Sequence, residues 1–200
     1  KTKNVDKYIY YFHGAVSTTK VYTATAFDNY DIIFCNGDYH LDEIRKRESI
    51  KKIKKKKLIK TGYFYFDYLN DKISTETQAK EILIAPSWNY NQKNFINENL
   101  EEIIQSVLNK GFTVKFRPHP ESFKRSMIII NNLKKKFSNE KFILDETSEN
   151  LNSMENAKCL ITDSSGIAIE FVLLFKRPVL YFDDNEKIHN TEFEDYNDLI

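Results

Sequence analysis

Two short polar turns carry side chains that commonly bind phosphate, and each turn directly follows an apolar run. The first turn, Asp163 to Gly166, includes the hydroxyls of Ser164 and Ser165 and precedes an apolar stretch typical of a helix. Backbone amides and hydroxyls therefore gather at a helix start, where an anion binds well. Glu170, one helical turn further on, could accept hydrogen bonds from ribose hydroxyls. The same residues would also serve as an ordinary capped strand-to-helix turn.

The second turn is Arg117-Pro118-His119-Pro120, which follows the apolar run from Phe112 to Phe116. Arg117 offers a rigid fork of donors for phosphate, and His119 can donate to a phosphate oxygen. The two prolines hold the turn in one shape before any ligand arrives. A rigid surface turn with a solvated histidine is the alternative interpretation.

The elements that position these turns alternate between strand and helix. Apolar runs bounded by turn residues predict strands at residues 8–12, 32–35, 58–62, 81–86, 112–116, 141–144, 159–161 and 179–182. Helices are expected at residues 23–30, 38–49, 95–110, 126–137, 148–156 and 167–175. This order predicts an α/β protein with a doubly wound parallel sheet and helices on both faces. Ligands bind outside the carboxyl ends of such strands, where both polar turns fall.

A polar stretch from Asn70 to Lys80, without a hydrophobic period, is the best candidate linker. It separates residues 1–69 from residues 81–200, and both regions alternate strand and helix. The first region opens directly on a strand without the elements that normally precede one. We therefore expect residues 1–69 to be the last part of a truncated domain.

The composition is that of a globular protein, with 41% hydrophobic and 14% aromatic residues. A net charge of +1 gives no global field that singles out nucleic acid as a partner. Cys35 and Cys159 lie in apolar runs, which predicts buried thiols in a reduced cytoplasmic protein. No run could span a bilayer, and no carboxylate cluster calls for a metal. His40 and His189 lie in polar stretches that we expect to be exposed.

The densest charge run, Arg45 to Lys60, contains ten basic residues and one acidic residue. A solvated helix end followed by a lysine-rich loop is the simpler explanation. In the alternative, the run binds a polyanionic acceptor or anionic lipid at the inner face of the cell membrane. The expected location is cytoplasmic, either free or peripheral to that membrane.

Five motifs in order give the chain a resemblance to the CDP-glycerol:poly(glycerophosphate) glycerophosphotransferase family of teichoic-acid and capsule synthesis. They are Phe12-His13-Gly14 with Lys20, Thr61 to Leu69, Ile84 to Trp88, Arg117 to Pro120, and Ile161 to Ser165 with Arg177 to Leu180. The resemblance covers most of the chain. It implies a GT-B arrangement of two Rossmann-like domains. Residues 1–69 would then belong to the acceptor side, and residues 81–200 would bind the nucleotide donor.

The resemblance also implies roles for individual residues. His13 would be the general base for the acceptor hydroxyl, with Gly14 and Lys20 in support and Asp67 orienting a loop. The residues implied to bind the donor's phosphates are Arg117, His119, Ser164, Ser165 and Gly166. To these we add Glu170, expected from its spacing to contact the ribose, and Asp163 in support. The family usually has Asp-Tyr-Ser-Ser followed by an aspartate, from which the Asp163 turn and Glu170 depart. That version is similar to the turn of the non-hydrolysing UDP-N-acetylglucosamine 2-epimerases, which share the fold.

The expected function is transfer of glycerol phosphate, or of a sugar, from a nucleotide-activated donor such as CDP-glycerol. The acceptor would be a growing teichoic acid or capsular polymer, or a lipid-linked acceptor, and no cofactor is expected. A UDP-sugar glycosyltransferase or an epimerase of the same fold is the alternative, and a non-catalytic nucleotide-binding module is the third interpretation. An epimerase needs carboxylates as acid and base, and the carboxylates before Gly62 lie in no persuasive turn, which favours transfer.

Overall fold

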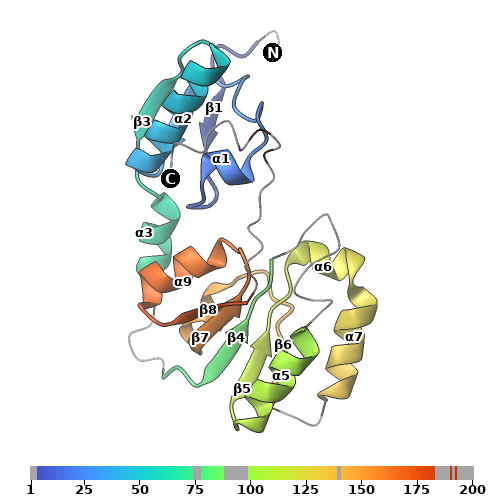
Figure 1. Ribbon diagram of the computed structural model, residues 1–200. Coiled ribbons are helices and arrows are strands. Elements are labelled where there is room, and N and C mark those ends of the chain that lie inside the picture. Colours follow the sequence, from blue (N-terminus) through green and yellow to red (C-terminus); the bar gives the residue numbers. More distant parts are fainter. Residues whose placement is uncertain are drawn as a thin grey trace. The chain divides into compact units, whose positions relative to one another are not determined.

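Figure 1 shows the computed structural model, which describes residues 4–73, 78–87, 99–138, 141–182, 190 and 192. The chain folds into two compact units, each built around its own parallel sheet. Unit 1 comprises Lys1–Tyr68 and Lys187–Ile200, and unit 2 comprises Leu69–Glu186. The boundary falls beside the stretch expected to be a linker. The last residues of the chain group with unit 1, whereas the sequence analysis assigned them to the second region.

Unit 1 contains a three-stranded sheet in the order β1-β2-β3, and both strand pairs are parallel. Strands β1 (Ile9–Tyr11), β2 (Ile32–Cys35) and β3 (Lys57–Lys60) fall within or beside three of the expected apolar runs. One face of this sheet contributes to a buried core. The core residues are Phe12, Phe27, Ile33, Cys35 and Ile44.

Among the described residues of unit 1, the helices are α1 (Thr18–Val21), α2 (Asp38–Lys51) and α3 (Phe64–Asn70), and the last two residues of α3 fall in unit 2. Helix α2 begins after Gly37 and ends at Lys52, which has the left-handed φ of +52°. The Lys52 N–H bonds back to carbonyls of the last helical turn, so the end of α2 is capped without a glycine.

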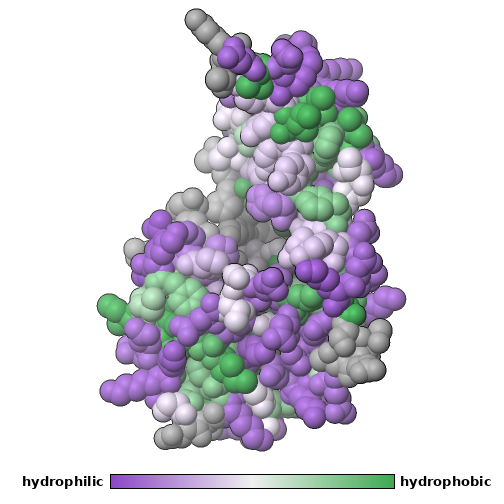
Figure 2. Space-filling model, turned by 180° about the vertical axis from the view of Figure 1, so that it is seen from behind, coloured by the Kyte–Doolittle hydropathy of each residue, from purple (hydrophilic) through white to green (hydrophobic). Residues whose placement is uncertain are grey.

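Aromatic rings fill most of the core of unit 1. Tyr10, Phe12, Tyr22 and Phe27 contact one another with ring centroids 5.1 to 6.2 Å apart, mostly edge to face. Tyr11, which points to the opposite side of β1, remains 61% exposed. Figure 2 shows hydrophobic side chains grouped among hydrophilic ones on the surface of this unit.

Unit 2 contains a five-stranded parallel sheet in the order β6-β5-β4-β7-β8. Its strands are β4 (Glu81–Ile84), β5 (Thr113–Phe116), β6 (Phe142–Leu144), β7 (Ala157–Thr162) and β8 (Val179–Tyr181). The chain runs outward from β4 to β6 and then returns to the other side of β4. The direction of winding therefore changes between β4 and β7, the position at which open α/β sheets bind ligands.

Helices cover both faces of the unit 2 sheet. In the described part of unit 2 they are α5 (Leu100–Asn109), α6 (Pro120–Arg125), α7 (Met127–Lys136), α8 (Leu151–Glu155) and α9 (Ile167–Phe175). Ile104 of α5 and Leu133 of α7 share one buried cluster with Ile84 of β4. Leu83 of β4 and Leu160 of β7 point to the opposite face of the sheet from that cluster. They are also fully buried, because α8 and α9 contact β7.

Several local expectations were wrong, and helices α1 and α3 were not expected. Residues 23–30 form successive turns instead of a helix. In these turns the backbone N–H of residue i donates a hydrogen bond to the carbonyl of residue i−3 at 3.0 to 3.1 Å. The buried ring of Phe27 anchors this segment to the core, so tertiary packing decides its conformation. Helix α6 was not expected; Pro120 occupies its first turn, where the missing N–H has no cost. The expected start of the helix at residue 95 lies outside the described residues.

In the part of the chain that the structure describes, no helix has the length and apolar character needed to cross a bilayer. Both cysteines are free thiols. Cys35 is fully buried, and burial raises the pKa of its thiol to about 11. Cys159, which we expected to be buried as well, is only partly so.

Candidate active site

The carboxyl edge of the unit 2 sheet brings the two polar turns together. Arg117 follows β5 and Asp163 follows β7, and these two strands flank β4. Two strand spacings, or about 10 Å, separate the turns. Because the three strands are parallel, both turns leave the sheet at the same edge, as the sequence predicted.

Asp163 links the ends of neighbouring strands. Its buried carboxylate accepts hydrogen bonds from the backbone N–H of Ser87 at 2.7 Å and from the Ser87 hydroxyl at 2.8 Å. The Thr162 hydroxyl donates to the Ala85 carbonyl at 2.6 Å. These bonds couple the segments after β4 and β7 and hold the serine turn in place. Asp163 thus has a supporting position.

The serine turn leads directly into α9. The backbone N–H of Ser165 donates to the Asp163 carbonyl at 2.6 Å, and the helix begins at Ile167. Gly166 has φ −60° and ψ −25°, so the backbone conformation does not require glycine there. Glycine instead leaves the start of the helix without a side chain, which allows close approach. The N–H groups of Ala168 and Ile169 donate to the carbonyls of residues 165 and 166. Exposed Ser164 and the N–H groups of Gly166 and Ile167 are therefore the donors of this turn that are suited to an anion.

Glu170 lies in the first turn of α9 and is bonded to the segment before α8. The side-chain amide of Asn150 donates to its carboxylate at 3.3 Å. A negative charge in the first turn is favourable because it interacts with the helix dipole. Asn150 therefore helps to hold the carboxylate beside the serine turn.

His119 caps the start of α6, and this contact determines where its proton lies. Its Nδ1 accepts a hydrogen bond from the backbone N–H of Glu121 at 3.1 Å. An accepting nitrogen carries no proton, so in the neutral ring the proton lies on Nε2. Nε2 is therefore the atom of this ring that can donate to a phosphate oxygen.

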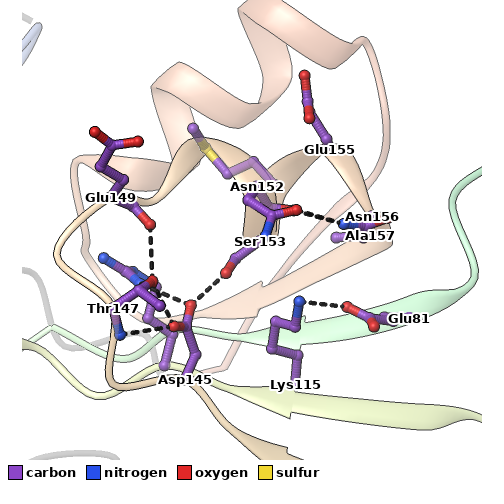
Figure 3. Close-up of polar contacts among 12 residues, drawn as sticks. Glu81, Lys115, Asp145, Thr147, Glu149, Asn152, Ser153, Glu155, Asn156 and Ala157 are labelled. Atoms are coloured by element: carbon purple, nitrogen blue, oxygen red, sulfur yellow. Dashed lines mark hydrogen bonds and ion pairs between the residues drawn. The ribbon is translucent and has the colours of Figure 1, made fainter. Parts of the chain in front are cut away.

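Arg117 contacts a buried carboxylate at the end of β6. Its Nη1 donates to Asp145 at 2.6 Å and to the Thr147 hydroxyl at 3.2 Å, and its Nη2 donates to the Ser148 carbonyl at 3.3 Å. Thr147 also donates to Asp145 through its N–H and its hydroxyl, and Ser153 donates from α8, as Figure 3 shows. Burial raises the pKa of Asp145, but these bonds outweigh it and hold the pKa at about 2.

The contacts of Arg117 bear on its expected role at the phosphate site. A guanidinium has five N–H donors, and the bonds to Asp145, Thr147 and Ser148 use three of them. The side chain is 13% exposed. Arg117 therefore joins the β5 turn to the segment after β6, and direct phosphate binding by its remaining donors stays a prediction.

His13 lies at the carboxyl edge of the unit 1 sheet, just after β1. Its side chain is exposed, and its ring meets the Tyr22 ring edge-on with centroids 6.4 Å apart. A pocket of about 370 Å³ opens at the same edge of the sheet, which is large enough for a small ligand. It is lined by Tyr11, Phe12, Phe34, Asn36, Thr61, Gly62 and Phe64.

The three supporting residues expected near His13 have different environments. A Cβ added to Gly14 would meet only the Val16 side chain at 3.9 Å, an ordinary contact, so the fold does not demand glycine there. Lys20 is in the last turn of α1, and its carbonyl accepts the backbone N–H of Asn190 at 3.2 Å. Asp67 is exposed on α3.

The basic run from Arg45 to Lys60 is less exposed than expected. Arg47 is buried and lies over the Phe27 ring at 5.2 Å, and Lys56 is buried with its ammonium donating to the Asp28 carbonyl at 3.1 Å. Arg45, Lys51 and Lys60 form ion pairs with Glu48, Glu192 and Asp38. The exposed lysines from the end of α2 to the first residue of β3 are Lys52, Lys54, Lys55 and Lys57. We refer to these four as the lysine loop.

The expectation that His40 is exposed was wrong. His40 is 0% exposed, and the centroid of its ring lies 4.0 Å from the centroid of the Phe12 ring. His40 is in the first turn of α2 on the side that faces the core, which its polar neighbours in the sequence concealed. His189 lies outside the described residues.

Sequence reasoning also missed three residues that organise the donor side. Ser87 and Asp145 each come shortly after a strand at the carboxyl edge, and that position was a usable signal. Asn150 had no comparable signal, because only the packing of α8 and α9 brings it to Glu170. Among the described residues, no group of three or more His, Cys, Asp or Glu could hold a metal ion.

Two parallel α/β units, with polar turns at the carboxyl ends of their strands, define a protein of the GT-B type. The chain belongs to the CDP-Glycerol:Poly(glycerophosphate) glycerophosphotransferase family, whose family model matches residues 18–199. The match begins shortly after the Phe12 to Gly14 motif. No protein with a curated description matches the chain.

Solved structures with the same fold include members of two enzyme groups. The chain is similar to the wall teichoic acid polymerase TagF, with 18% identity and a TM-score of 0.52 over 90% of this chain and 50% of that chain. It is also similar to UDP-GlcNAc 2-epimerase from Methanocaldococcus jannaschii, with 20% identity and a TM-score of 0.57 over 79% of this chain and 47% of that chain. The chain thus spans about half the length of each. At these identities the likeness shows the fold alone.

Proposed function

We propose that the chain is part of a transferase that moves glycerol phosphate from CDP-glycerol to a growing cell-surface polymer, either a teichoic acid or a capsular polysaccharide. Membership of the glycerophosphotransferase family over residues 18–199 carries this proposal. Two polar turns at the carboxyl edge of unit 2 support binding of a nucleotide-activated donor. The donor contains its own leaving group, so the reaction needs no cofactor.

On the donor side, the departing nucleotide phosphate is stabilised by neutral donors already in position. Nε2 of His119 donates from one turn, and the hydroxyls of Ser164 and Ser165 donate from the other. The first amides of α9, beginning at Gly166, add the positive end of the helix dipole. Glu170, held by Asn150, accepts from the ribose hydroxyls.

On the acceptor side, His13 removes the proton from an acceptor hydroxyl. The freed oxygen forms a bond to the β-phosphorus of CDP-glycerol, and the bond from that phosphorus to CMP breaks, so that CMP leaves with the bonding electrons. The imidazole must be neutral at the start in order to accept this proton. The aromatic pocket lined by Tyr11 and Phe64 is the acceptor subsite in this proposal.

A second candidate function keeps the fold and changes the donor. The Asp163 to Gly166 turn followed by Glu170 is similar to the corresponding turn of UDP-N-acetylglucosamine 2-epimerases, which favours a UDP-sugar. The reaction would then be glycosyl transfer or epimerisation.

Calorimetric titration of the chain with CMP, CDP, CDP-glycerol, UDP and UDP-N-acetylglucosamine tests the donor. We expect cytidine nucleotides to bind selectively, and His119→Ala to weaken them by roughly 10- to 100-fold through loss of one charge-assisted bond. Lys110→Ala, at the opposite edge of the same sheet, is the matched control and should bind as the wild type does. Preference for uridine nucleotides would establish the second candidate, and binding to none of them would contradict the two-turn phosphate site.

We also propose that the lysine loop binds anionic lipid. Because of these four exposed lysines, the chain should sediment with phosphatidylglycerol vesicles at low salt. At high salt it should be released from the vesicles. Replacing all four by glutamine should abolish this binding, whereas Lys134→Gln, Lys135→Gln and Lys136→Gln together on α7 should not. Equal loss in both variants would refute a specific role for the loop.

A further inference from the structure

Three side chains hold the backbone of the loop that carries His13. The Tyr63 hydroxyl donates to the His13 carbonyl at 2.9 Å. The Asn36 side-chain amide donates to the carbonyl of residue 14 at 3.0 Å, and His40 Nε2 lies 3.0 Å from the carbonyl of residue 16. We call Asn36, His40 and Tyr63 the carbonyl clamp.

The members of the carbonyl clamp come from rigid parts of unit 1. Asn36 directly follows β2, His40 lies in the first turn of α2, and Tyr63 directly precedes α3. His40 is 0% exposed and Tyr63 is 7% exposed, so both side chains are fixed by packing. The clamp therefore connects an exposed loop to the buried framework of the sheet.

The direction of the bond from His40 is also fixed. The Asn36 N–H donates to His40 Nδ1 at 3.2 Å, so the proton of the neutral ring lies on Nε2 and points at the Val16 carbonyl. Burial lowers the pKa of His40, although the bond to Val16 and the charge of Glu43 oppose this effect. The ring is thus kept neutral, with one nitrogen accepting and the other donating.

The same face of α2 anchors the next segment of the loop. The Glu43 carboxylate accepts from the Ser17 hydroxyl at 2.8 Å and from the Thr18 N–H at 2.6 Å. Ser17 in turn caps α1 through the N–H groups of residues 19 and 20. The loop is therefore held continuously from residue 13 to the start of α1.

We propose that Asn36, His40 and Tyr63 are positioning residues that set the direction of the His13 imidazole toward the acceptor hydroxyl. This inference rests on the proposed function, in which His13 is the base. Fixing three carbonyls restricts the backbone dihedral angles of the loop and hence the direction of the His13 side chain. Displacing a catalytic group by about 1 Å costs up to about 100-fold in rate.

Three variants test the clamp in the full chain. His40→Leu removes both ring bonds, Tyr63→Phe removes one hydroxyl, and His40→Gln retains a side-chain N–H that can reach the Val16 carbonyl. The assay is release of CMP from CDP-glycerol with poly(glycerol phosphate) as acceptor. We expect His40→Leu and Tyr63→Phe to lower kcat by roughly 10- to 100-fold with KM for CDP-glycerol unchanged. His40→Gln should recover most of kcat, and Tyr68→Phe, on the exposed side of α3, is the matched control.

A second measurement tests the carbonyl clamp without an activity assay. Long-range ¹H–¹⁵N spectra of the histidine rings should show His40 as the neutral tautomer protonated on Nε2, and amide exchange should report the order of residues 14–17. We expect exchange in this loop to accelerate in His40→Leu and Tyr63→Phe but not in His40→Gln. Wild-type exchange and kcat in Tyr63→Phe and His40→Leu would overturn the clamp. A His13→Ala variant with wild-type kcat would instead overturn the role of His13, so the two failures are distinguishable.

Discussion

Replacing Asp145 by asparagine should destabilise unit 2 by about 2–4 kcal/mol at pH 7. The carboxylate is 7% exposed and accepts hydrogen bonds from Arg117, Thr147 and Ser153. Its pKa of about 2 lies below the ordinary value of 3.8, and that difference corresponds to about 2 kcal/mol of stabilisation. Asparagine has nearly the same shape, but it leaves the Arg117 charge unpaired and directs an N–H₂ group toward donors. Breaking a buried pair in this way typically costs about 3–5 kcal/mol, which sets the upper end of the range.

Urea denaturation followed by tryptophan fluorescence measures this effect. Trp88 is the single tryptophan of the chain, so the emission comes from one fluorophore. The urea midpoint of Asp145→Asn should fall by about 1–2 M with an unchanged slope. Glu102→Gln, which changes the same charge at an exposed position of α5, should stay within about 0.5 kcal/mol of the wild type.

The pH dependence provides the decisive outcome. The pKa of Asp145 is lower in the folded chain than in the unfolded one, so its contribution is complete above the unfolded pKa and is lost as the pH falls through about 2. The difference in unfolding free energy between wild type and Asp145→Asn should therefore shrink from pH 5 toward pH 2. A difference below about 1 kcal/mol at pH 7, or one that does not change with pH, would refute the reasoning.

Three further predictions concern other parts of the site. Gly14→Ala should change the free energy of unfolding by less than about 0.5 kcal/mol in urea titrations, so a loss of activity in that variant would show that a ligand approaches the loop closely. Asp163→Ala should cost about 1–3 kcal/mol in the same titrations, because it leaves the buried N–H of Ser87 without its acceptor. Since burial lowers the pKa of folded His40, the wild type should lose stability as the pH falls below the ordinary value of 6.5, and His40→Gln should lack this loss in thermal unfolding across that range.

Most strands were predictable from the sequence because they are apolar runs that end in turn residues, and β3 retains only the apolar pair of residues 58 and 59. Helix α9, Ile167–Phe175, begins and ends at the expected residues, since a glycine turn precedes it and Arg177-Pro178 follows it. The segment from Thr23 to Tyr30 was not predictable in the same way. Its apolar residues fit a helical period, but burial of Phe27 among neighbouring rings stabilises consecutive turns instead.

The candidate site was predictable in its location and not in its contacts. The carboxyl edge of a parallel sheet follows from strand order, which is why Arg117 and the serine turn were expected together. The pairing of Arg117 with Asp145 joins residues 28 positions apart, and the bond from Asn150 to Glu170 joins residues 20 positions apart. Such pairs depend on how α8 and β6 pack, for which a single sequence contains no local signal.

The lysine loop and His13 lie at opposite ends of the unit 1 sheet, because one precedes β3 and the other follows β1 in parallel strands. The four residues of β3 span about 13 Å. If the strands stand upright on a membrane touched by the lysine loop, His13 lies about one strand length from that membrane. An acceptor anchored in that membrane would have to extend past the sheet before its end reached His13. Anchoring at this loop would thus favour polymers already several units long over their short precursors.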